Sequence, residues 1–72
     1  MKLNEVAVGG RARVLHVSGD DAVKRHLGAL GFVAGALVRV SGSSYGNIIL
    51  AIHESRIALD EATAMLIEVD RA

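Results

Sequence analysis

The 72-residue sequence contains no cysteine and no tryptophan, and its only aromatic residues are Phe32 and Tyr45. Without cysteine, neither disulfide bonds nor thiolate metal ligands can stabilise the fold. A chain of this length has room for one hydrophobic core, so we expect a single domain over residues 1–72. Because 51% of the residues are hydrophobic and nearly all of these are aliphatic, that core must consist of aliphatic side chains.

An excess of charge of one sign is also lacking, since eight basic side chains balance eight acidic ones. A surface for nucleic acid needs clustered lysine and arginine that displace counterions, so this balance argues against a nucleic-acid partner. The longest aliphatic run, residues 48–52, is far shorter than the roughly 20 residues of a membrane helix. The first residues show no apolar segment of the kind found in secretory signals. We therefore expect a cytoplasmic protein without direct membrane insertion.

A strand, a helix and a turn are predicted for the first half of the chain. Residues 11–17 alternate, with Ala12, Val14 and His16 on one face of an expected strand. The aspartates at 20 and 21 can accept bonds from the free N–H groups of a first helical turn. The spacing of residues 23, 27 and 30 extends this helix to about residue 30. Gly31 then stands where a left-handed C-terminal cap favours glycine.

Beyond Gly31 the apolar period changes from that of a helix to that of a strand. We expect a strand around Val38 and Val40, a polar loop over residues 41–47, and a hairpin of residues 48–52 and 56–59. One helical turn near residues 60–64 then precedes a closing strand from Met65 to Val69. Because five short strands on so small a core would expose long edges, a closed or nearly closed barrel is favoured. The predicted fold class is mostly β, a small barrel of about five strands with one helix inserted after the first strand and a short N-terminal turn.

Catalytic chemistry finds little support in the sequence. The candidate bases are His16, His26 and His53, but the serines fall in predicted turns, where serine is an ordinary local hydrogen-bonding residue. No serine stands in a strained nucleophile-elbow motif, and no glycine-rich loop is followed by the lysine of a phosphate-binding loop. We expect a protein that is not an enzyme.

Metal binding would have to use histidine and carboxylate ligands, which suit zinc or ferrous iron. His16, His53 and Glu54 are the candidate ligands if the barrel brings their strands together. No two histidines have the close spacing of a metal motif, and two ligands alone would hold a divalent ion weakly. The alternative is that these are ordinary surface histidines. We expect no required cofactor, with weak binding of Fe²⁺ or Zn²⁺ as an option.

Aliphatic side chains occur on both faces of the predicted strands. Leu15, Ile49 and Leu66 point away from the residues assigned to the barrel interior. They could form an exposed apolar patch for a partner, or a second small core beneath the helix. The scarcity of aromatic rings argues against a reader of proline-rich peptides, whose grooves are lined with such rings.

The stretch Leu27-Gly28-Ala29-Leu30-Gly31-Phe32-Val33-Ala34-Gly35 resembles the signature of the FeoA family. Ala34 departs from the pattern, because the family usually has proline there. Gly35 is kept, and a type II turn needs glycine at that position for its positive φ. The resemblance extends over nearly the whole chain, through Leu3 with Val8-Gly9, Arg13-Val14 to Gly19, Lys24-Arg25, Ile57-Ala58-Leu59 with Ala62, and Ile67-Glu68-Val69.

This resemblance implies an SH3-like barrel and a cytoplasmic role in ferrous iron transport. The implied partner is the cytosolic, GTPase-bearing part of the FeoB membrane transporter, whose activity the module would modulate by binding. The alternative is a module that binds or senses a transition metal, similar to the C-terminal domain of iron-dependent repressors. A structural oligomer formed through strand edges is a third possibility, and the oligomeric state stays open. The candidate partner-binding residues are Lys24, Arg25, Leu15, Ile49, Leu66 and Tyr45.

Overall fold

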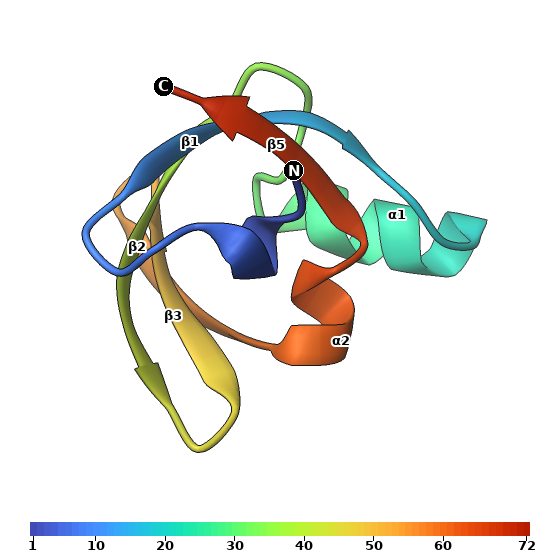
Figure 1. The fold of residues 1–72 in the computed structure, drawn as a ribbon. Coiled ribbons are helices and arrows are strands. Elements are labelled where there is room, and N and C mark those ends of the chain that lie inside the picture. The colour runs from blue at the N-terminus through green and yellow to red at the C-terminus, as the bar shows by residue number, and fades with distance from the viewer.

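The computed structural model describes all 72 residues and contains five strands, two α-helices and one 3-10 turn (Figure 1). The elements follow the order η1 (Leu3–Glu5), β1 (Arg11–Val17), α1 (Asp21–Ala29), β2 (Leu37–Ser44), β3 (Asn47–Ile52), β4 (Ser55–Asp60), α2 (Glu61–Ala64) and β5 (Ile67–Arg71). No helix is both long enough and apolar enough to cross a membrane.

The strands form one antiparallel sheet in the order β4-β3-β2-β1-β5, which curls around the core (Figure 1). The predicted SH3-like barrel with a helix after the first strand is confirmed. The barrel is not fully closed, because β4 and β5 are not paired with each other. The turn η1 and helix α2 pack at this opening, where Leu3 and Ala64 are completely buried.

Thirteen apolar residues form the core, and no polar or charged side chain is buried with them. The strands contribute alternate positions, as a half-buried sheet requires. Phe32 is the one aromatic ring inside, so nearly all the packing is aliphatic. The buried residues are Leu3, Ala12, Val14, Leu27, Phe32, Val38, Val40, Leu50, Ile52, Leu59, Ala64, Ile67 and Val69.

Helix α1 has the ends that the sequence predicts. The Oδ1 atom of Asp20 accepts a 2.9 Å hydrogen bond from the Val23 N–H, which satisfies one free donor of the first turn. Leu27 is the buried anchor of the helix, and Gly31 beyond its end has a φ of +107°. In the following turn Gly35 has a φ of +89° and donates a 2.8 Å hydrogen bond to the Val14 carbonyl. Both glycines therefore serve as turn and cap residues.

Three local predictions are wrong. The polar residues predicted as a loop over 41–47 instead extend β2 to Ser44 and begin β3 at Asn47, because this hairpin continues past the core with both faces in solvent. His16 does not share the buried face of Val14, because an irregularity in the β1–β5 register between these residues turns it outward. Met65 lies at the end of α2, and the last strand begins only at Ile67.

Candidate functional site

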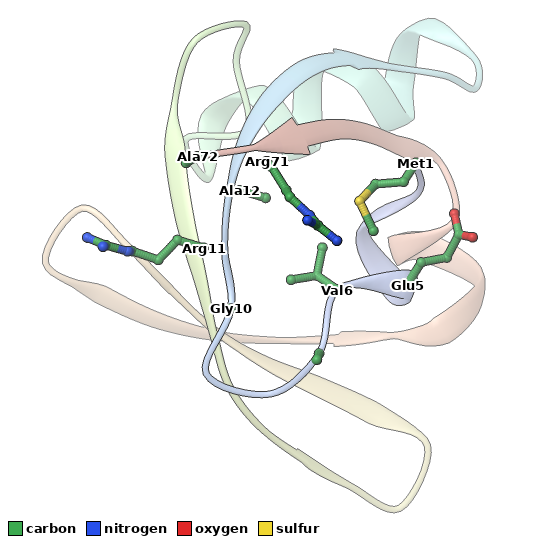
Figure 2. Close-up of a pocket in the computed structure, with 9 residues that line it drawn as sticks. Met1, Glu5, Val6, Gly10, Arg11, Ala12, Arg71 and Ala72 are labelled. Atoms are coloured by element: carbon green, nitrogen blue, oxygen red, sulfur yellow. The ribbon is translucent and has the colours of Figure 1, made fainter.

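A pocket of about 360 Å³ lies between the N-terminal segment and the ends of β1 and β5 (Figure 2). The Arg71 side chain points into it, whereas the Arg11 side chain points away. Apart from the two arginines, the only ionisable side chain that lines the pocket is that of Glu5. Its Oε1 atom accepts a 2.6 Å hydrogen bond from the backbone N–H of Lys2. These residues do not include a nucleophile beside a general base, the arrangement that covalent acyl transfer uses.

Glu68 fastens the start of the chain to β5. Its Oε2 atom lies 2.6 Å from the N-terminal ammonium, and its Oε1 atom lies 2.9 Å from the Lys2 Nζ atom. The Val69 N–H adds a 2.8 Å hydrogen bond to the Met1 carbonyl. The hydrogen bond from the N-terminal ammonium, followed by that from Lys2, lowers the pKa of Glu68 to about 2. The first residues thus cover an edge of the sheet that would otherwise be open to other strands.

The three candidate metal ligands do not form a metal centre. His16 lies opposite Glu68 across β1 and β5, whereas His53 and Glu54 lie in the turn between β3 and β4. The His53 ring packs on Gly31, where an added Cβ atom would lie 2.9 Å from its Cδ2 atom. No group of three or more histidine, aspartate or glutamate side chains is arranged to hold a metal ion.

The candidate partner-binding residues do not share one patch. Leu15 is 46% exposed, while Ile49 and Leu66 are partly buried. Lys24 and Arg25 are exposed on α1, and Figure 1 shows this helix on a different side of the molecule from the β2–β3 hairpin, whose turn contains Tyr45.

Tyr45 is fully exposed at the turn of this hairpin. Its φ is +51° and that of Gly46 is +79°, so both turn residues have the left-handed conformation of a type I′ turn. Asparagine is common at the first of these positions, whereas a bulky residue there is strained. The exposed ring is therefore present in spite of a cost in folding free energy.

A hollow of about 340 Å³ next to this turn contains an acceptor that sequence patterns did not reveal. The Oδ1 atom of Asn4 is buried there without a hydrogen-bond partner. Asn4 belongs to η1, far from the hairpin in sequence, and only the folded chain brings the two together. An unpaired buried acceptor is costly to the fold.

The fold and these exposed groups define a small SH3-like module with features that suit binding. The sequence model of the FeoA domain family matches residues 1–71 of this chain, and the chain therefore belongs to this family. This membership supports an accessory role in ferrous iron transport. A comparison with curated protein sequences finds no match.

Several solved structures, two FeoA proteins among them, are similar over nearly the whole chain. One is FeoA from Stenotrophomonas maltophilia complexed with zinc, with 30% identity, a TM-score of 0.86 and coverage of 97% of this chain and 89% of that one. It is described as a prokaryotic SH3 domain protein and suggested as a ferrous iron transport activating factor. The other is FeoA from Chlorobium tepidum, with 32% identity, a TM-score of 0.91 and coverage of 99% and 70%, respectively.

The same fold occurs in a manganese-dependent transcriptional repressor. The TM-score is 0.89 and the identity is 23%. The match covers 100% of this chain and 41% of the repressor. At this identity the likeness shows the fold alone.

Proposed function

We propose that this protein is a cytoplasmic accessory of ferrous iron transport that acts by binding, without catalysing a reaction. Its partner is the cytosolic, GTPase-bearing part of a FeoB-type transporter, and binding modulates uptake. The observation that carries the proposal is the match of the FeoA domain over residues 1–71. The relative suggested as a ferrous iron transport activating factor supports it further.

The β2–β3 hairpin is the contact surface that the geometry supports best. Tyr45 presents a whole aromatic ring to solvent, and aromatic residues are enriched where protein interfaces carry most of their binding energy. Leu15 on β1 and the α1 residues Lys24 and Arg25 are exposed and are further candidate contacts, separate from the hairpin.

A titration of the ¹⁵N-labelled protein with the transporter's cytosolic domain tests the proposal, with and without GTP. We expect saturable amide shifts at residues 43–47 and on α1. Tyr45→Ser should weaken binding at least tenfold, as loss of an aromatic hot spot does. Val8→Ser removes another exposed apolar side chain, 62% exposed, and serves as the matched control. Absence of any shift at near-millimolar partner concentration would refute the proposed partner.

Metal binding is the second candidate, favoured by the zinc complex of the relative. An ordinary site for a resident metal has three or four protein ligands, and the residues of this chain do not form such a group. Calorimetry with Zn²⁺ and Fe²⁺ separates the two functions. A metal-sensing module should give a saturable heat that His16→Ala or His53→Ala abolishes, whereas the docking module should give none that depends on these residues.

A further inference from the structure

Arginine side chains form a transverse row on the outer face of the sheet. Arg11 on β1 lies directly opposite Arg39 on β2, Arg39 lies opposite Ala51 on β3, and Ala51 lies opposite Arg56 on β4. Directly paired residues of an antiparallel sheet point to the same side, so three arginines share one row. Arg13, two residues after Arg11, adds a fourth on the same face.

These arginines have no internal partner to explain them. The ion pairs of the structure both involve Glu68, and none includes an arginine. Arg13 alone is held, by a 3.0 Å hydrogen bond from its Nη1 atom to the Gly35 carbonyl. Like charges placed directly opposite each other destabilise a sheet, so the pairing of Arg11 with Arg39 has a cost that the fold itself does not repay.

Between the arginines the surface is a shallow, partly apolar hollow of about 520 Å³. Leu37, which is 51% exposed, lines this hollow together with Arg39 and Ala51. Arg56 lines an adjoining hollow of about 460 Å³, which shares Ala51 and His53 with the first. Adjacent strands lie about 4.7–4.9 Å apart, so Arg39 and Arg56 stand roughly 10 Å from each other. The hollow can therefore receive an extended chain with charged groups at intervals.

We propose that this arginine row binds a short, acidic, extended segment of a protein partner. The guanidinium group binds carboxylates through two parallel hydrogen bonds, which favours arginine over lysine at such a site. The aliphatic floor would contact the uncharged parts of the segment. The proposal stands whether or not that partner is the transporter.

Phosphate-bearing partners fit this surface less well. Built phosphate sites use free backbone N–H groups at helix starts or in glycine-rich loops, whereas these arginines lie on strands whose backbone groups pair within the sheet. No phenylalanine, tyrosine or tryptophan lines the hollow, and its one ring, that of His53, packs on Gly31, so a platform on which successive nucleic-acid bases could stack is lacking. Acidic residues also bound the row, with Asp70 opposite Arg13 on one side and Glu54 near Arg56 on the other. They would repel the continuous charge of a nucleic acid or a membrane, but not a short segment.

The probe for the test is a capped peptide of alternating glutamate and serine, titrated at low salt into the ¹⁵N-labelled protein. Its control is the same peptide with glutamine in place of glutamate. We expect saturable shifts of the backbone and Nε signals of Arg11, Arg39 and Arg56 with the acidic peptide only. Arg39→Gln should weaken binding about tenfold, the size of one lost charge-assisted hydrogen bond. Arg71→Gln makes the same change of charge on β5, where the side chain points into the pocket beside the N-terminal segment, and should alter binding less than about twofold.

Three results would overturn the proposal. The first is equal weakening by Arg71→Gln, which would mean a general effect of charge. The second is tighter binding at this face by an oligothymidine or by vesicles of phosphatidylserine and phosphatidylcholine. The third is a clear fall in the melting temperature of Arg39→Gln, which would mean that Arg39 serves to stabilise the fold. The proposal expects an unchanged or higher melting temperature, because the substitution relieves the repulsion between Arg39 and Arg11.

Discussion

The imidazole ring of His53 lies directly on the Cα atom of Gly31. A Cβ atom added to Gly31 would come within 2.9 Å of the His53 Cδ2 atom and 3.0 Å of its Nε2 atom. His53 itself has a φ of +54°, unusual for a residue other than glycine. The contact joins the end of α1 to the turn between β3 and β4, so Gly31 is needed for its conformation and for the space it leaves.

Gly31→Ala should therefore destabilise the protein by more than the cost of placing a residue with a Cβ atom in this backbone conformation. A residue with a Cβ atom in the left-handed region costs about 1–2 kcal/mol. Displacing the His53 ring from its rotamer should add about 0.5–1.5 kcal/mol. Urea unfolding followed by circular dichroism measures the sum.

Gly35→Ala is the matched control for this experiment. Gly35 has a comparable φ of +89°, but nothing lies within 4 Å of its added Cβ atom, so it should show the conformational cost only. The double variant Gly31→Ala/His53→Ala should be closer in stability to Gly35→Ala. Equal destabilisation by the two single alanine variants would show that the His53 contact contributes nothing.

Much of the fold follows from local patterns in the sequence. The contact between Gly31 and His53 is an example of a feature that local patterns do not predict. Gly31 is recognisable as a cap because it follows a helical apolar stripe, and Val38 and Val40 alternate as a half-buried strand must. No local pattern places His53 against Gly31, because the two are joined only by the curl of the sheet. The outward position of His16 depends on an irregularity of pairing with β5, which is equally non-local.

The candidate site was less predictable than the fold for the same reason. Tyr45 is recognisable as an exposed residue of a polar hairpin, but the unpaired Asn4 beside it is not. The arginines at positions 11, 39 and 56 are scattered in a sequence of zero net charge. Only the register of four strands gathers them into one row.

Removal of the N-terminal cap of α1 should lower the stability of the whole domain. Asp20→Ala leaves the Val23 N–H without its 2.9 Å acceptor and should cost about 1 kcal/mol. Asp20→Asn keeps a side-chain oxygen in the same place and should cost only a few tenths. Thermal melts at neutral pH compare the two variants, and an equal loss in both would point to charge in place of the hydrogen bond.

The contacts of Glu68 predict a specific loss of stability in acid. Its pKa is lowered to about 2 in the folded protein, while the unfolded chain has the ordinary value of 4.5. The stabilisation is therefore complete above pH 4.5 and is lost as the pH falls towards 2. Glu68→Gln should be less stable than the wild type at neutral pH, and the difference should shrink through this window. Unfolding free energies measured at several pH values test this, and a constant difference between the two proteins would contradict it.

Tyr45→Asn should stabilise the protein while impairing its binding to a partner. Asparagine adopts the left-handed conformation of this turn more easily than tyrosine, and relief of the strain should contribute about 1 kcal/mol. Because the ring is fully exposed, its removal costs no packing in the core. Tyr45→Phe is the control, since it keeps both the ring and the backbone strain and should leave the melting temperature unchanged. A higher melting temperature for Tyr45→Asn together with weaker binding would mean that the exposed ring is kept at the expense of stability, which is the pattern expected of a residue that contacts a partner.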